Sequence, residues 1–259
     1  MSVVFIKRQW ILGAVLVVAL FYLGYDLFLA PAASSMVTAD RAAATPQKQA
    51  HQSHPAHQTH NATHSKQGYQ VLSAGIRAKP MVQSFMAQDP GRIQVLDFFS
   101  YACYGCMRWR PFLEPWLKKH EKELVAYHMP ILFNEQWAPF ARAYFVVKQL
   151  HKNDSLDGPL FKALHEDGID LAERPKMVDF FEAHGVPRQT FESLYDSFSV
   201  NQEMLKAKNI AEAYEIAASP SLIINTPQAS YLITPDHVQG SGSALISALD
   251  ALLAQSALP

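Results

Sequence analysis

Ile93-Gln-Val-Leu-Asp-Phe-Phe-Ser-Tyr-Ala-Cys-Tyr-Gly-Cys106 is the stretch of this 259-residue sequence that decides the fold. Its first half is almost continuously apolar, which is typical of a strand buried on both faces. Its second half holds the only two cysteines of the chain, Cys103 and Cys106, and leads into a helix-like run that ends near Lys119. The stretch therefore predicts a buried strand, a short turn and a helix that begins at the cysteines.

The position of the two cysteines indicates redox chemistry. The N–H groups of a first helical turn lack partners and the helix dipole is positive there, so a thiolate is stabilised and its pKa falls. A zinc site needs about four ligands, and the sequence has no second cysteine pair. A structural disulfide that closed so short a loop would add little stability. We therefore interpret Cys103 and Cys106 as a redox-active pair.

The first 31 residues predict a membrane signal-anchor. Lys7 and Arg8 precede the apolar run at 11–25, and the positive-inside rule places the chain that follows outside the cytoplasm. The run approaches the length of about 20 residues that a span requires. We favour an uncleaved anchor because Ala30-Pro31-Ala32 is a poor cleavage site. The alternative is a signal peptide that is cleaved off. Either way, the thiols would work in an oxidising compartment.

Residues 32–68 predict a disordered tether. They are rich in Ala, Ser, Thr, Gln, Pro and His, and such a segment cannot bury enough apolar surface to offset the entropy of ordering it. Five histidines recur in it every three or four residues, namely His51, His54, His57, His60 and His64. Histidine-rich tracts can bind zinc, copper or nickel. No cysteine or carboxylate cluster accompanies them, so we assign no metal site.

Residues 69–259 predict one α/β domain. Periodicity and turn residues place strands at 69–72, 93–100, 123–129, 221–224 and 230–233, helices at 107–119 and 243–255, and a mostly helical block at about 135–217. The second and third strands should be parallel and the last two should form an antiparallel hairpin. Pro111 and Pro115 should kink or interrupt the first helix. The net charge of −1 gives no reason to expect nucleic-acid binding.

This order of elements, with Cys-x-x-Cys at the first strand-to-helix junction, resembles the thioredoxin fold. The large helical block resembles the insertion of the DsbA family of exported thiol-disulfide oxidoreductases. The matching pieces are 97–106, 127–129 and 218–225, and the resemblance covers roughly residues 69–256. It implies a thioredoxin-like mixed sheet with an inserted helical subdomain at about 135–217.

The chemistry then predicts distinct roles for three residues. Cys103, at the start of the helix, should be the exposed nucleophile, and Cys106, one turn further, the buried resolving thiol. Asp97 lies within an apolar strand, where a buried carboxylate is costly unless it has a purpose. The resemblance implies that this acid helps to move the proton of the buried cysteine. The alternative is an aspartate that reaches solvent at the edge of the strand.

The resemblance also implies a substrate-binding set around the cysteines. Pro220, which we count with the catalytic residues, would be a cis proline facing the disulfide, with an ordinary proline at a strand start as the alternative. The Ser219 backbone would pair with an extended substrate segment, beside Tyr104 and Gly105. The chain departs from well-known oxidases in the Tyr-Gly dipeptide, in Ser219, and in Ala126 where relatives carry a buried lysine.

Other charged residues near the site are interpreted as structural. Arg108 and Arg110 are interpreted as solvated helix residues, with partial replacement of the missing positive charge near the cysteines as the alternative. His128, His165 and His184 are interpreted as satisfied structural or surface histidines.

Taken together, these features predict an enzyme that introduces disulfides into exported proteins and needs no small-molecule cofactor. Its partners would be cysteine-containing substrates and a DsbB-like membrane oxidase that recharges it. It would lie on the periplasmic side of the inner membrane, anchored by residues 1–31. One alternative is an isomerase or reductase kept reduced by a DsbD-like donor. Another is a metal-handling protein that uses the His-rich tether.

Overall fold

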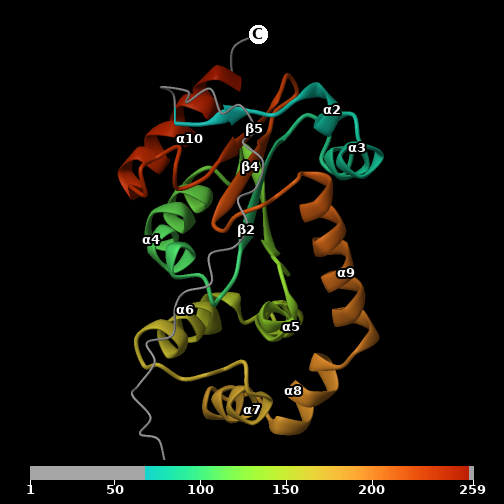
Figure 1. Cartoon of the computed structure of the whole chain (residues 1–259), viewed down its shortest axis with the longest axis vertical. Helices are drawn as coiled ribbons and strands as arrows, with labels where there is room; N and C mark the ends of the chain where they lie inside the picture. Colours follow the sequence, from blue (N-terminus) through green and yellow to red (C-terminus); the bar gives the residue numbers. More distant parts are fainter. Residues whose placement is uncertain (1–67, 257–259) are drawn as a thin grey trace, which may run out of the picture. The chain divides into compact units, whose positions relative to one another are not determined.

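The structure is a computed structural model that describes residues 68–256 (Figure 1). The predicted anchor at 1–31 and the tether histidines lie outside the described residues, so both stay predictions. Among residues 68–256, no helix has the length and apolar character needed to cross a membrane.

A five-stranded mixed sheet forms the centre of the described residues. The strands are β1 (Gln70–Val71), β2 (Ile93–Phe99), β3 (Leu124–Pro130), β4 (Ser221–Asn225) and β5 (Ser230–Ile233). Their order in the sheet is β1-β5-β4-β2-β3, with β2 and β3 parallel and the other pairs antiparallel. The predicted parallel pair and the predicted hairpin are both confirmed. In this order β3 is an edge strand, whereas β2 lies between two neighbours.

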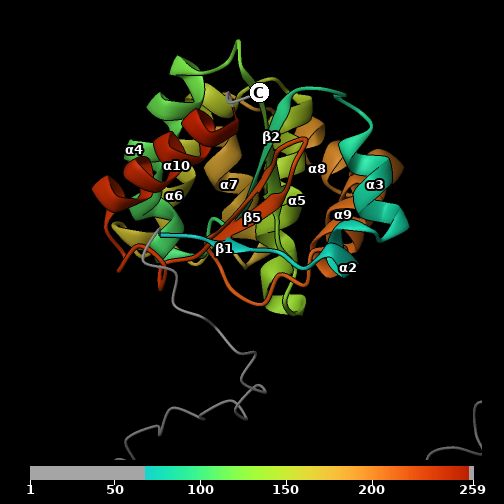
Figure 2. The same cartoon turned by 90° about the horizontal axis from the view of Figure 1, so that it is seen from above.

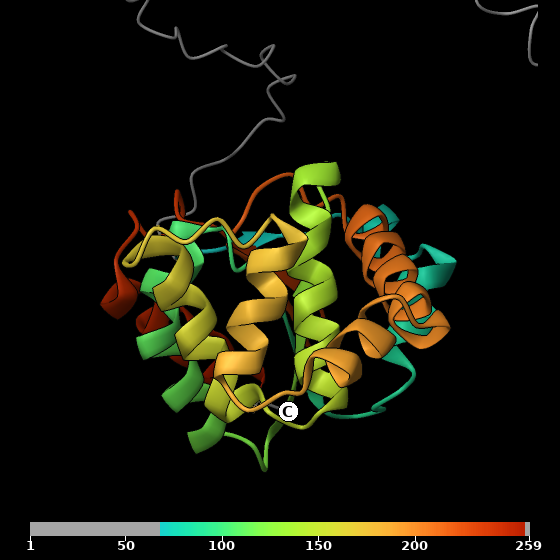
Figure 3. The same cartoon turned by 90° about the horizontal axis from the view of Figure 1, so that it is seen from below.

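Helices cover both faces of the sheet. They are α2 (Ala74–Arg77), α3 (Pro80–Met86), α4 (Tyr104–Lys119), α5 (Ala138–Gln149), α6 (Asn153–His165), α7 (Arg174–Ala183), α8 (Arg188–Tyr195), α9 (Phe198–Ala213) and α10 (Gly242–Ser256), with a 3₁₀ turn at Glu135–Trp137. Figure 2 shows α4 and α10 on one side of the strands and α3 and α9 on the other. Figure 3 shows the yellow to orange helices of the insertion in front of the strand ends. The predicted α/β fold with a helical insertion is confirmed.

The two faces of β2 belong to two separate hydrophobic clusters, because side chains alternate along a strand. Leu96 and Phe98 pack among α3, α5 and the rest of the insertion. Val95 faces the other way and packs with Trp109 of α4 and Leu249 of α10. By the same alternation, Asp97 shares the face of Val95 and so lies on the side of α4. The strand therefore delivers its one acid beneath the helix that begins at the cysteines.

Helix α4 differs from its prediction in one respect. It begins at Tyr104, directly after Cys103 as expected, but it continues to Lys119 without the interruption expected at Pro111 and Pro115. Both prolines are exposed. The carbonyl groups that lose their helical N–H partners lie on that same exposed face, where water can satisfy them.

Candidate active site

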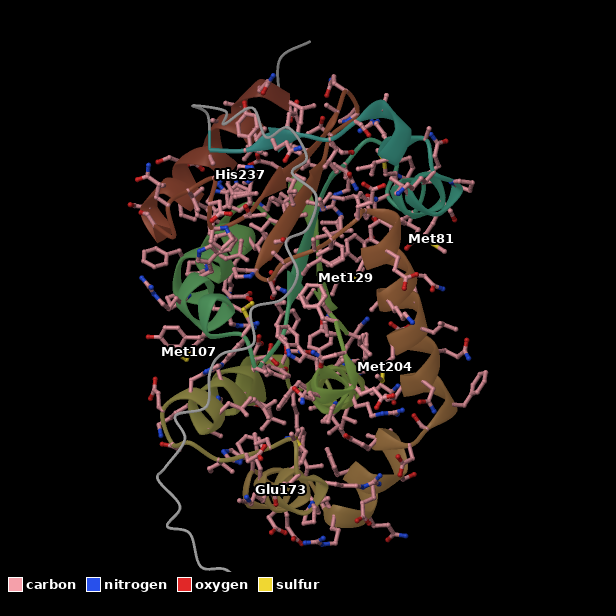
Figure 4. The ribbon with its side chains drawn as sticks, in the orientation of Figure 1. Met81, Met107, Met129, Glu173, Met204 and His237 are labelled. Atoms are coloured by element: carbon pink, nitrogen blue, oxygen red, sulfur yellow. The ribbon has the colours of Figure 1, made fainter. Side chains whose placement is uncertain are left out.

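The two cysteines occupy the start of α4. Cys103 is the N-cap residue, with an extended backbone, and its Sγ accepts a hydrogen bond of 3.2 Å from the Cys106 backbone N–H. The preceding turn is closed by the Cys103 N–H, which donates to the Ser100 carbonyl at 3.0 Å. The sulfur thus takes the place of the oxygen that usually caps a helix, and the cap stabilises negative charge on it. Figure 4 labels Met107, the residue after Cys106, in this first turn.

Both cysteines are free thiols in this structure, and both are buried. Cys106 is 3% exposed, as expected for the inner thiol, but Cys103 is only 8% exposed. The prediction that Cys103 is exposed is therefore wrong. The reason is the close approach of the Pro220 loop to the first turn: a Cβ added to Gly105 would lie 3.0 Å from Pro220 Cδ and 3.9 Å from Cys103 Sγ.

The two thiols differ strongly in acidity. The pKa of Cys103 falls from the ordinary 9.0 to about 7, chiefly because the Cys106 thiol donates to its sulfur, and against the opposing effect of burial. Ser219 and the Cys106 backbone N–H lower this pKa further. Burial and the neighbouring Cys103 raise the pKa of Cys106 well above its ordinary value. At neutral pH one sulfur is therefore a nucleophile and the other a protonated donor.

The predicted substrate-binding residues surround this pair. The Ser219–Pro220 peptide bond is cis, and Ser219 Oγ lies 3.1 Å from Cys106 Sγ. Pro220 is buried, and β4 begins immediately after it. Tyr104, by contrast, is 57% exposed at the surface beside the cysteines. The structure thus brings Tyr104, Gly105, Ser219 and Pro220 together around the two sulfurs.

Asp97 is buried, as predicted, and it has a partner that sequence reasoning missed. Its Oδ2 accepts a hydrogen bond of 3.0 Å from Nδ1 of His128, the residue that pairs with it in the β2–β3 register. Burial alone would lower the pKa of His128, but the hydrogen bond to Asp97 and the charges of Asp97 and Glu114 outweigh burial and raise it. His128 is therefore a satisfied histidine, as predicted, and its partner is the buried acid of the candidate active site. The parallel alignment of the two predicted strands could have indicated that Asp97 and His128 are neighbours.

A second charged network joins α4 to the insertion. Arg110 forms ion pairs with Asp157 of α6 at 2.7 Å and with Glu114 at 3.1 Å. Asp157 is buried and also accepts a hydrogen bond from the Tyr101 hydroxyl, in the turn before Cys103. The interpretation of Arg110 as a solvated residue is therefore wrong, whereas Arg108 is exposed as expected. The network needs a partner 47 residues away in sequence, which no local pattern indicates.

The remaining histidines agree with their prediction as satisfied residues. His165 Nε2 lies 2.7 Å from the Tyr101 carbonyl oxygen, and its ring packs against the exposed Tyr104. His184 Nδ1 lies 2.7 Å from the Phe180 carbonyl oxygen on α7. Within residues 68–256, no three histidine, cysteine or acidic side chains are grouped so as to hold a metal ion.

Comparisons with known proteins agree with this geometry. A family model described as a DSBA-like thioredoxin domain matches residues 94–244. The thiol:disulfide interchange protein DsbA of Bordetella parapertussis is 30% identical over 170 residues, which cover 66% of this chain and 79% of that protein. DsbA of Azotobacter vinelandii is 30% identical over 137 residues, covering 53% and 64%. The crystal structure of Pseudomonas aeruginosa DsbA superposes with a TM-score of 0.60 at 26% identity, covering 64% of this chain and 85% of that chain.

The acidity of Cys103 predicts the pH dependence of its alkylation. The thiolate is the reactive form and exists above the pKa, which is about 7. We expect the rate with iodoacetamide to be half-maximal near pH 7, to reach a plateau above it and to fall about tenfold per pH unit below it. Cys103→Ser should remove this phase, because the pKa of Cys106 is raised. Half-maximal reaction near pH 9 would contradict the site geometry.

The Arg110–Asp157 pair predicts a large loss of stability when it is broken. Asp157→Ala would leave Arg110 half-buried without its closer partner, and we expect the free energy of unfolding in urea to fall by about 3 kcal/mol. Asp167→Ala is the matched control, because Asp167 forms an exposed pair with Lys162. Equal stability of the two variants would show that the buried pair does not hold α6 to α4.

Proposed function

This chain belongs to the DSBA-like thioredoxin domain family and is a thiol:disulfide oxidoreductase, and from this premise we propose that it introduces disulfides into exported proteins through Cys103. The observation that carries the proposal is the unequal pair at the start of α4. The pKa of Cys103 is about 7, while the thiol of Cys106 beneath it has a raised pKa.

The proposed reaction is two successive thiol–disulfide exchanges. In the oxidised enzyme, a substrate thiolate attacks Cys103 Sγ, the bond to Cys106 breaks, and its electron pair remains on Cys106, which takes up a proton. The second substrate thiolate then attacks the substrate sulfur of the mixed disulfide. Cys103 leaves as a thiolate, and its lowered pKa makes it the better leaving group.

The substrate would lie as an extended segment beside Ser219. Pairing of β4 with β2 begins at Ser221, so the Ser219 backbone precedes the ladder. A substrate strand placed there would run next to Cys103, with the exposed ring of Tyr104 on its other side. Gly105 supports this arrangement because it lets Pro220 approach the first turn closely.

The direction of net electron flow distinguishes two candidate functions. A pKa of about 7 for Cys103 resembles the value of about 7 in thioredoxin more than that of about 3.5 in DsbA. This observation favours a milder oxidant than DsbA. It also keeps open the second candidate, an isomerase or reductase kept reduced by a DsbD-like membrane donor. The DsbA relatives support the oxidase, which a DsbB-like partner would recharge.

The proposed location is the periplasmic side of the inner membrane. Lys7 and Arg8 before the apolar run at 11–25 support an N-terminal anchor that leaves the catalytic domain outside the cytoplasm. A disulfide donor also needs an oxidising compartment. Residues 32–68 would then set the distance between the membrane and the domain.

The reduction potential of the Cys103–Cys106 pair tests the oxidase. We expect a value between the roughly −120 mV of DsbA and the roughly −270 mV of thioredoxin, when the full chain is titrated against glutathione at pH 7. The oxidised protein should also transfer its disulfide to a reduced, unfolded secreted protein, and Cys103→Ser should abolish this transfer. A potential at or below that of thioredoxin, with no transfer, would refute the oxidase and favour the reductase.

The location is tested by fractionation of cells that express the full chain. We expect the chain to remain in the membrane pellet after carbonate extraction and to be digested by protease added to spheroplasts. Replacing the apolar run at 11–25 by a cleavable signal peptide should release the domain into the periplasmic fraction. A protease-protected chain would contradict the proposed orientation.

A further inference from the structure

His128 lies between two acidic side chains, one at each ring nitrogen. Its Nδ1 is 3.0 Å from Asp97 Oδ2, and its Nε2 is 3.9 Å from Glu114 Oε1. That Glu114 oxygen is buried and accepts no hydrogen bond from the described residues, although Arg110 lies 3.1 Å away. An imidazolium carries an N–H on both nitrogens, so it can direct an N–H at each of the two acids, whereas a neutral ring has an N–H for only one of them. The surroundings are therefore built for a histidine that gains and loses a proton.

Burial decreases in steps from the inner sulfur to His128. Cys106 is 3% exposed, the Asp97 side chain 7%, and the His128 side chain 23%. The order follows from the topology, because Asp97 lies on the inner strand β2 while His128 lies on the edge strand β3. Asp97 is near enough to both sulfurs for its charge to raise the pKa of Cys103 and of Cys106. His128 is thus the hydrogen-bonded contact between this acid and water.

We propose that His128 supplies the proton that is taken up when the Cys103–Cys106 disulfide is reduced. His128 is a positioning residue, because it acts on the sulfurs through Asp97. The proposal rests on the proposed function. When the disulfide bond breaks and its electron pair stays on Cys106, the Asp97 carboxylate accepts the proton of His128 Nδ1 and passes it to that sulfur. Asp97 is then a carboxylate again, and His128 regains a proton from water. Each reduction thus moves one solvent proton to Cys106, and reoxidation returns it.

The charges around His128 agree with a proton that is taken up on reduction. Asp97 on β2 and Glu114 on α4 favour the imidazolium, whereas Arg110 on α4 opposes it. On the side of α5 and α9, His128 lines a pocket of about 290 Å³ whose titratable side chains are those of Tyr127, Tyr144, Lys148, Glu203 and Lys206. Reduction adds the Cys103 thiolate to this set of charges. The added negative charge favours protonated His128, and by linkage protonated His128 favours the reduced pair.

The titration of His128 in the two redox states tests the proposal. The imidazole resonances of the protein are followed by NMR against pH, once with the pair oxidised and once with it reduced, and His128 is assigned from the spectrum of His128→Gln. We expect the pKa of His128 to be higher in the reduced protein. Equal pKa values of His128 in the two states would overturn the proposal.

A kinetic measurement separates a proton-transfer role from a structural one. His128→Gln keeps an N–H donor for Asp97 but cannot titrate. We expect it to slow single-turnover oxidation of a dithiol peptide at pH 7 by about 100-fold, a typical loss for a missing proton-transfer group. His184→Gln is the matched control and should stay within about twofold of the wild-type rate. A wild-type rate for His128→Gln would overturn the proposal.

A second variant keeps the test decisive if His128→Gln fails to fold. Asp97→Asn preserves shape but cannot pass a proton to Cys106, so it should slow the single-turnover oxidation at pH 7 by about 100-fold as well, and a wild-type rate for Asp97→Asn would exclude the route through Asp97. The inference and the proposed function can fail separately, because small thiol reagents set the redox state in the NMR titration and no protein substrate is needed.

A protein whose His128 pKa rises on reduction, but which oxidises no unfolded protein, would therefore refute the proposed function alone. Equal His128 pKa values in an active oxidase would refute this inference alone.

Discussion

Strand β2 has side chains buried on both faces, and the chain must therefore supply a helical layer on each side of it. Helices α4 and α10 form one layer, and α3 together with the insertion forms the other. The strand ends where α4 begins, so the same constraint that builds the core places Cys103 at a helix N-terminus above the strand. Strand alternation then fixes Asp97 on the side of α4. The position of the cysteines and of the acid is thus a consequence of how one strand is buried.

Charged side chains beneath α4 form two linked groups, and the desolvation of each group is compensated in a different way. Arg110 and Asp157 hold the insertion to the active-site helix, and their desolvation is offset by an ion pair, by Glu114 and by the Tyr101 hydroxyl. Asp97 and His128 carry a desolvation penalty that two apolar residues of similar volume would avoid. Their retention in a buried position is better explained by chemistry than by stability. The first group positions the site, and the second sets its electrostatics.

The sequence was sufficient to predict the elements that follow local rules. The apolar run of β2, the hairpin of β4 and β5, the helical block and the placement of Cys106 all depend on residues near one another in the chain. The burial of Cys103 was not predictable in this way, because it depends on Pro220, which lies more than a hundred residues later. Arg110 looked solvated for the same reason: its partner Asp157 belongs to another helix. The hydrogen bond between Asp97 and His128 was missed, although the parallel register of the two predicted strands could have indicated it.

The burial of Cys103 beside Cys106 also governs how this site meets reactive oxygen species. A sulfur with 8% exposure offers little surface to peroxide, which limits the first oxidation to sulfenic acid. A sulfenic acid formed on Cys103 would have the Cys106 thiol one helical turn away. Condensation of the two expels water and yields the disulfide before sulfinic acid can form. Peroxide would therefore return the protein to its disulfide form instead of destroying the nucleophile.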